Sequence, residues 1–189
     1  MLRKQRTLKQ SISCYGMGLH TGMIVNMTIH PLPPRSGVVF QRLDIEGHPR
    51  IKATYGNISD TRLATSLSAG GAEVKTVEHL LAVFAGMGID NVLVQLDAPE
   101  VPILDGSAAT FIYLIRHAGV VDQRELQPCM QVRKTVRVED DGRSAEISPA
   151  IQTEIYCSID FDHPLIGEQK AAYIHSVESF CREIGPART

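Results

Sequence analysis

The 189-residue sequence has neither an excess of positive charge nor a long hydrophobic run. Lys and Arg total 19 against 21 for Asp and Glu, a formal net charge of −2, so the composition does not indicate the basic surface typical of nucleic-acid-binding proteins. No stretch approaches the roughly 18 apolar residues of a membrane span, and the charged start, residues 1–7, lacks the apolar core of a secretory signal. We therefore expect a cytoplasmic protein that binds no nucleic acid and has no stable membrane span.

Several motifs of common catalytic and metal sites are also missing. The four cysteines are far apart and lack Cys-x-x-Cys spacing, which argues against a zinc knuckle or a redox pair and favours free thiols: Cys14, Cys129, Cys157 and Cys181. The sequence has no phosphate loop and no Gly-x-Gly-x-x-Gly that opens a helix. It also lacks the Gly-x-Ser-x-Gly elbow, so a serine hydrolase of that type is not indicated.

A helix pattern with a Glu–His pair at its start is the most informative feature that is present. Apolar residues recur at the i, i+4, i+7 and i+8 positions of one helix face: Val77, Leu81, Phe84 and Ala85. This pattern predicts a helix that begins at its N-cap Thr76 and ends at Gly86 and Gly88. Glu78 and His79 lie in its first turn, facing away from the apolar residues.

The Glu–His pair has two interpretations. A neutral imidazole can bind a metal ion while the adjacent carboxylate reaches a water on that ion, which is the division of labour in zinc hydrolases. Alternatively, Glu78 complements the positive end of the helix dipole and His79 is a solvated polar residue. The two residues alone leave both interpretations open.

The wider context of the pair resembles one enzyme family. The blocks Thr76-Val-Glu-His-Leu80, Gly86-Met-Gly-Ile-Asp-Asn91 and Ala98-Pro-Glu-Val-Pro-Ile-Leu-Asp-Gly-Ser-Ala108 closely resemble, in this order, the zinc-dependent UDP-3-O-acyl-N-acetylglucosamine deacetylases. The likeness extends from Gln5 to the C-terminal Ala187-Arg-Thr. It implies hydrolysis of the acetamide of an acylated UDP-sugar, with release of acetate, in the committed step of lipid A biosynthesis in Gram-negative bacteria. It also implies a monomer when complete.

The resemblance assigns roles to three residues of the reaction centre. Glu78 corresponds to the general base, His79 to a zinc ligand, and Thr189 to the threonine that stabilises the oxyanion. A catalytic zinc generally takes three protein ligands, and His79 is the one convincing ligand in this sequence. The resemblance places the other two in a His-x-x-x-Asp stretch beyond residue 189. Glu100 and Asp105 are either carboxylates that orient a ligand histidine or carboxylates satisfied within their own loop.

The glycine-rich segment Tyr15-Gly-Met-Gly-Leu-His-Thr-Gly22 and a second segment near residue 63 are candidates for the walls of a substrate pocket. Three glycines allow a close approach of the backbone to a ligand, although a wide hairpin turn with a solvated His20 is equally compatible with the residues. The resemblance implies that Leu19, His20 and Leu63 line the pocket.

The order of the patterns predicts an α+β fold. We expect two similar domains, each a mainly antiparallel sheet layered with helices in a β-α-α-β sandwich. The first domain spans residues 1–126 and carries a small inserted sheet near residues 60–75, with a hairpin across Gly70-Gly71. A polar linker at residues 122–128 precedes the second domain, residues 127–189. The expected strands are residues 6–14, 23–30, 37–43, 50–55, 92–96, 130–138, 144–148 and 153–161, and a final helix follows its cap Ser176.

The second domain is expected to be incomplete. The resemblance indicates an N-terminal portion of a deacetylase that lacks two zinc ligands and is inactive alone. The alternative is a non-catalytic binding or interaction fragment that retains part of the sugar-nucleotide cleft.

Overall fold

A five-stranded sheet organises the first half of the chain in the computed structural model, which describes residues 3–188. Its strand order is β2-β3-β9-β4-β5, and every neighbouring pair is antiparallel except β4 and β9, which run parallel. The strands are β2 (Ile12–Met17), β3 (Ile24–Pro31), β4 (Val38–Arg42), β5 (Arg50–Lys52) and β9 (Val92–Leu96). The predicted α+β class is confirmed.

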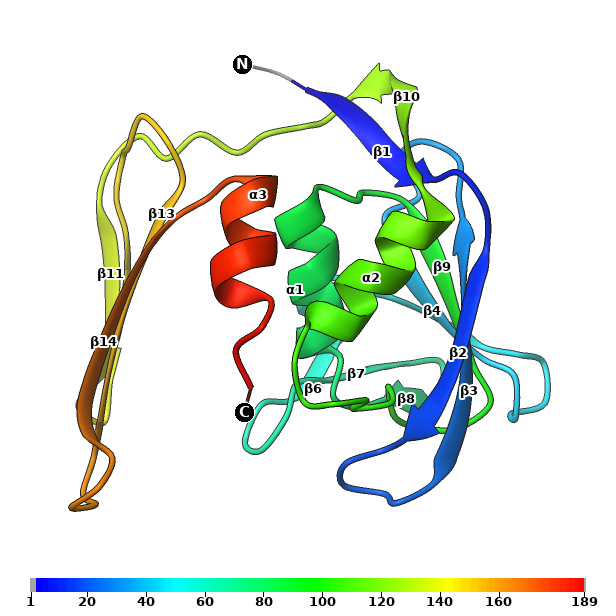
Figure 1. The fold of residues 1–189 in the computed structure, drawn as a ribbon, viewed down its shortest axis with the longest axis horizontal. Coiled ribbons are helices and arrows are strands. Elements are labelled where there is room, and N and C mark those ends of the chain that lie inside the picture. The colour runs from blue at the N-terminus through cyan, green and yellow to red at the C-terminus, as the bar shows by residue number, and fades with distance from the viewer. Residues whose placement is uncertain (1–2, 189) are drawn as a thin grey trace.

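Two helices, α1 (Glu78–Met87) and α2 (Ala109–Ala118), cover one face of this sheet (Figure 1). Successive strand residues point to opposite faces, so the register places Ile29, Val94 and Phe40 side by side on the covered face. They form one buried cluster with apolar residues of both helices, among them Phe84 and Phe111. This core fixes where the first turn of α1 lies.

The first and last strands of this half pair with each other. β1 (Lys4–Leu8) runs antiparallel to β10 (Val120–Leu126), and a buried amide network joins them, in which Asn91 donates to Gln5 and Gln123. Two expectations were therefore wrong. The alternation of residues 6–14 is divided between β1 and β2, and most of the expected linker 122–128 belongs to a strand.

The small inserted sheet is present. It contains β6 (Ile58–Asp60), β7 (Ser66–Ala69) and β8 (Ala72–Val74) in that order, after the 3₁₀ turn η1 (Tyr55–Asn57). The predicted Gly-Gly hairpin joins β7 to β8, and both glycines have positive φ. From β8 the chain continues directly into α1, so this sheet borders the Glu–His pair.

The helix α1 differs from its predicted form at its start. Its N-cap is Val77, no side chain caps it, and Thr76 adopts a positive φ of 57°. The prediction of Thr76 as N-cap was wrong because its hydroxyl donates to Glu100 instead. The end at Gly88 is confirmed, since this glycine forms the left-handed C-cap.

The apolar face of α1 is also rotated from the prediction. Ala85 is exposed and Leu81 is half-buried, so the predicted stripe is only partly correct. The buried face instead combines Val77 and Phe84 with three further residues: Leu80, Val83 and Met87.

Two hairpins and a short helical segment form the second half. The hairpins are β11 (Val136–Asp140) with β12 (Arg143–Ile147) and β13 (Glu154–Phe161) with β14 (Gly167–Ile174). The helical turn α3 (Val177–Ser179) continues into the π-helical turn η2 (Phe180–Ile184) and begins with the predicted cap Ser176, which forms a reciprocal capping box with Ser179. Figure 1 shows this helical segment between the hairpins and α1.

None of the helices within residues 3–188 has the length and hydrophobicity needed to cross a lipid bilayer.

Candidate active site at the start of helix α1

Glu78 and His79 lie together in the first turn of α1, where both side chains are half-buried. The preceding segment pairs with the chain beyond β9, because Lys75 N–H donates to Pro99 O and Val101 N–H donates to Lys75 O. This pairing directs the chain from β8 into the helix. The site is therefore placed by the five-stranded sheet and the inserted sheet together.

One oxygen of Glu78 is held by the inserted sheet. Thr65 N–H donates to Glu78 Oε2 over 2.9 Å, and Val77 N–H donates to Thr65 O over 3.2 Å. These two bonds attach the segment before β7 to the start of α1. Glu78 Oε1 has no hydrogen-bond partner within the described part of the chain. This oxygen can therefore accept a hydrogen bond from a bound ligand or water.

Glu100 lies behind this turn as a fully buried carboxylate, with 0% of its surface exposed. Its Oε1 accepts from Thr76 Oγ1 at 2.7 Å and from His20 N at 3.0 Å, and its Oε2 accepts from Thr21 N and Oγ1, both at 2.8 Å. Burial alone would raise the pKa of this carboxyl, but the hydrogen bonds from His20, Thr76 and Thr21 outweigh burial and hold the pKa below its usual value.

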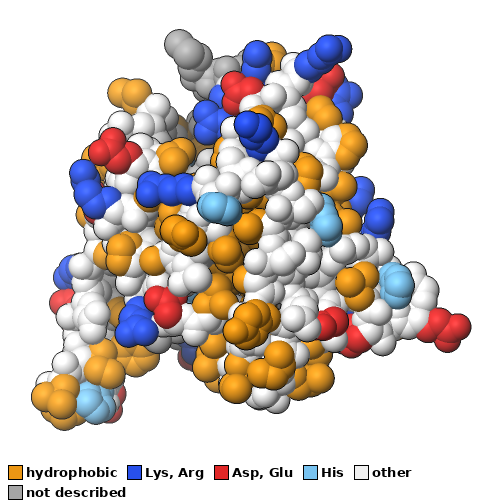
Figure 2. Space-filling model, turned by 45° about the vertical axis from the view of Figure 1, so that its right-hand side comes forward, with side chains coloured by type: hydrophobic (Ala, Val, Ile, Leu, Met, Phe, Trp, Pro, Cys, Tyr) orange, Lys and Arg blue, Asp and Glu red, His pale blue; other side chains and the backbone are white. Residues whose placement is uncertain are grey.

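The glycine-rich loop is thus attached to the same carboxylate as the start of α1. His20 and Leu19 are exposed at the end of the β2–β3 hairpin, and Leu19 keeps 55% of its surface. Leu63, between β6 and β7, is 87% exposed and lies two residues before Thr65. Figure 2 shows hydrophobic side chains gathered where the β2–β3 hairpin ends. The exposed apolar residues there are Tyr15, Met17, Leu19, Met23 and Ile24.

No group of three His, Cys, Asp or Glu side chains that could hold a metal ion occurs within residues 3–188. The described donors at this site are the imidazole of His79 and the carboxylate of Glu78. The imidazole fits one ligand of a zinc ion and the carboxylate fits a base beside it. These two residues do not complete a site with three protein ligands.

Thr189 lies outside the described residues. Its neighbour Arg188 contacts the loop before α2, because Arg188 Nε donates to Asp105 O over 2.9 Å and its backbone pairs with Ser107. Gly185 O also accepts from Ala108 N–H. The C-terminal segment therefore runs along the start of α2.

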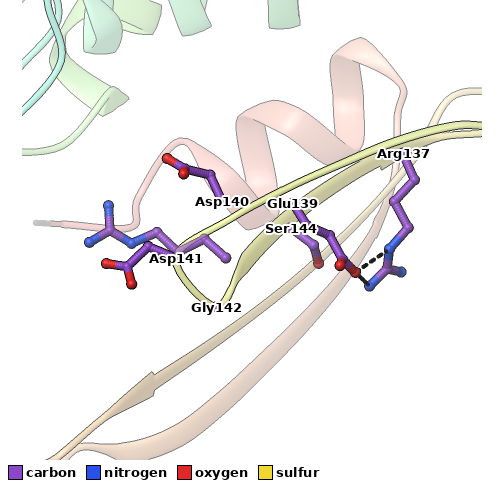
Figure 3. Close-up of a pocket in the computed structure, with 7 residues that line it drawn as sticks. Arg137, Glu139, Asp140, Asp141, Gly142 and Ser144 are labelled. Atoms are coloured by element: carbon purple, nitrogen blue, oxygen red, sulfur yellow. Dashed lines mark hydrogen bonds and ion pairs between the residues drawn. The ribbon is translucent and has the colours of Figure 1, made fainter.

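Two hollows lie in the second half, away from the Glu–His pair. One, of about 390 Å³, surrounds the β11–β12 turn. There Arg137 donates hydrogen bonds to Glu139, while the side chains of Asp140 and Asp141 extend outward (Figure 3). The other, of about 1000 Å³, lies between the two hairpins. Neither is lined by Glu78, His79 or His20.

Residue patterns missed three groups that shape the site: Gly18, Thr65 and Thr76. A Cβ at Gly18 would contact the Thr21 hydroxyl and the Glu100 carboxylate, so only glycine leaves room for this hydrogen-bond cluster. The sequence left two roles open for Glu100: to orient a ligand histidine, or to be satisfied within its own loop. Its two oxygens accept hydrogen bonds within the cluster, and among the described residues no histidine side chain forms a hydrogen bond with it. Its position between two prolines was the available signal.

The family model for LpxC, UDP-3-O-acyl N-acetylglycosamine deacetylase, matches residues 5–189. Proteins named UDP-3-O-acyl-N-acetylglucosamine deacetylase are similar to this chain. The protein of Myxococcus xanthus is 47% identical over 185 residues, which cover 98% of this chain and 59% of the relative. The protein of Chromohalobacter salexigens is 44% identical over 188 residues, 98% of this chain and 62% of the relative. The chain thus spans about three fifths of the length of these curated relatives.

Proposed function

This chain belongs to the LpxC family of UDP-3-O-acyl-N-acetylglucosamine deacetylases, and on that premise we propose that the whole protein hydrolyses the acetamide of UDP-3-O-acyl-N-acetylglucosamine. The products are acetate and the free amine, and the reaction is the committed step of lipid A biosynthesis. The observation that carries the proposal is the half-buried Glu78–His79 pair at the start of α1, where Thr65 N–H binds Glu78 and Thr76 binds Glu100.

Glu78 is the general base of this reaction. Thr65 N–H fixes Oε2, so the carboxylate keeps one orientation while Oε1 accepts the proton of the attacking water. A protonated group then donates the proton with which the amine leaves.

His79 is one ligand of a catalytic zinc ion, and the remaining ligands come from residues outside this chain. A bound zinc ion supplies Lewis-acid activation of the water and of the acetamide carbonyl. His79 follows Glu78 in the first turn of α1, so ligand and base stand beside one another. Thr189 donates its hydroxyl to the oxyanion that develops on the carbonyl oxygen.

Leu19, His20 and Leu63 line the substrate pocket. The two leucines are exposed in the described chain and offer apolar surface to an acylated substrate. His20 is carried by a loop whose backbone N–H groups bind Glu100, so its position relative to α1 is fixed. The protein acts in the cytoplasm, as a monomer.

The decisive experiment measures acetate release from UDP-3-O-acyl-N-acetylglucosamine by the purified whole protein. We expect zinc-dependent turnover that a chelator abolishes and added zinc restores. Turnover that persists without metal would contradict the zinc assignment. Binding of the nucleotide sugar without acetate release would favour the alternative, a non-catalytic binding module.

A further inference from the structure

The buried carboxylate of Glu100 has no cationic partner within residues 3–188. Ionised side chains are almost never fully buried unless they are paired, because removing a charge from water is costly. Here four uncharged donors replace water: the backbone N–H groups of His20 and Thr21 and the hydroxyls of Thr21 and Thr76. Both oxygens of the carboxylate accept hydrogen bonds, and no donor belongs to the segment that carries Glu100.

These donors join three segments that are distant in sequence. His20 and Thr21 belong to the loop between β2 and β3, Thr76 immediately precedes α1, and Glu100 follows β9. Backbone hydrogen bonds also join these segments to one another. Val101 N–H donates to Lys75 O, and Ile103 N–H donates to Met17 O. The carboxylate therefore lies at the junction of the loop that carries His20 and the turn that carries Glu78 and His79.

Two backbone features adapt the chain to this junction. Thr76 is 2% exposed and has a φ of 57°, an uncommon conformation for a β-branched residue, which aims its hydroxyl at Glu100. Gly18 leaves the space that a Cβ would take from Glu100 and Thr21. Strained or tightly restricted backbone of this kind persists only where its surroundings determine it.

We propose that Glu100 is a positioning residue of the active site. Its carboxylate sets the distance between the His20 loop and the first turn of α1, and so places His20 relative to Glu78 and His79. It touches neither the substrate nor a metal. The catalytic consequence of this role depends on the proposed deacetylase function, whereas the structural consequence does not.

The structural part is tested by amide hydrogen exchange on this 189-residue chain. Glu100→Gln keeps the shape but turns an NH₂ group toward N–H and O–H donors, so the His20 and Thr21 amides should exchange on the order of tenfold faster. Glu46→Gln, the same change at an exposed turn, should leave both amides unchanged. Unchanged exchange at His20 and Thr21 in Glu100→Gln would overturn the inference.

A second pair of variants carries the test if Glu100→Gln does not fold. Thr76→Val removes the hydroxyl that donates to Glu100 while keeping the branched shape, and Thr76→Ser keeps the hydroxyl. We expect faster exchange at the His20 amide in Thr76→Val and protection close to wild type in Thr76→Ser. Equal exchange in the two variants would contradict the role of the hydroxyl–carboxylate bond.

The catalytic part is tested in the whole protein by separating kcat from KM. A displacement of about 1 Å at a reacting group can lower the rate by on the order of 10²-fold. Thr76→Val should lower kcat at least about tenfold, and Thr76→Ser should restore most of it. Normal kcat in Thr76→Val, together with faster amide exchange, would overturn the positioning role. Absence of acetate release in the wild-type protein would instead overturn the proposed function, and the exchange data would still decide whether Glu100 joins the loop to α1.

Discussion

The ring of Phe180 occupies the space into which a side chain at Gly86 would extend, so the C-terminal helical segment packs directly on the backbone of α1. Gly86 and Phe180 are both buried, and Phe180 keeps only 5% of its surface. A helix interior normally favours alanine over glycine by about 1 kcal/mol. The glycine is therefore explained by this close approach and not by helix formation.

We predict that Gly86→Ala destabilises the protein although it raises helix propensity. The added methyl group must displace the Phe180 ring, and overpacking of this kind costs about 1–3 kcal/mol. Chemical denaturation measures the free energy of unfolding. Gly56→Ala is the matched control because its Cβ would meet open space. A stabilised Gly86→Ala protein would show that η2 does not pack against α1 in solution.

Glu78→Gln should abolish turnover while leaving the fold intact. The amide cannot accept the proton of the attacking water, and general-base catalysis contributes about 10²–10⁴-fold to the rate. Metal content should stay unchanged, because Glu78 is not a ligand in the proposed site. Acetate release and metal analysis on the whole protein check both statements, with Glu46→Gln as the control. Near-normal activity would refute the assignment of the base.

Local patterns were sufficient to predict the strands that carry clear alternation. The strands β3, β4 and β9 and the Gly-Gly hairpin lie where those patterns indicated, and Ser176 caps its helical segment as expected. The pairing of β1 with β10 was missed because it joins residues more than 100 positions apart, and alternation within one strand does not show which strand pairs with it.

The candidate site was predictable only in part, for a similar reason. Glu78 and His79 could be placed at a helix start from the spacing of their apolar neighbours. The donors to Glu100 lie 24 to 80 positions away from it, and the left-handed conformation of Thr76 has no residue signature because threonine rarely adopts it. Tertiary contact therefore determines the role of Thr76, where helix-capping preference alone suggested an N-cap.

Acid should reveal the state of Glu100. Its pKa in the folded protein lies below the ordinary value of 4.5, so its contribution to stability is complete above that pH and is lost as the pH falls through the folded-state pKa. At pH 7 Glu100→Gln should cost about 1–3 kcal/mol, because donors lose their acceptor. The difference between wild type and variant should shrink as the pH falls below about 4.

Denaturant unfolding at several pH values measures this difference. The four donors to Glu100 are uncharged backbone N–H and hydroxyl groups. A difference that grows toward low pH would contradict a carboxylate stabilised in its charged form.

Arg42 should control the attachment of the inserted sheet. Its guanidinium is buried, binds both oxygens of Asp44 at 2.8 and 2.7 Å, and donates to Glu73 O on β8. Arg42→Lys loses this fork geometry, so we expect a loss of about 1–3 kcal/mol and faster amide exchange in β7 and β8. Arg50→Lys, at an exposed position of β5, should change stability by less than about 0.5 kcal/mol. Equal effects of the two substitutions would rule out the proposed attachment.

Zinc retention distinguishes the proposed enzyme from a binding module. The start of α1 offers the imidazole of His79, and no group of three metal-binding side chains occurs within residues 3–188, so the 189-residue chain should lose zinc on dialysis. The whole protein should keep one zinc ion per chain and lose it in His79→Ala, while His117→Ala, at an exposed position of α2, should retain it. Elemental analysis after dialysis measures all four samples. Tight stoichiometric zinc on the 189-residue chain would mean that its own residues complete the site, and the assignment of the missing ligands to polypeptide beyond residue 189 would then be wrong.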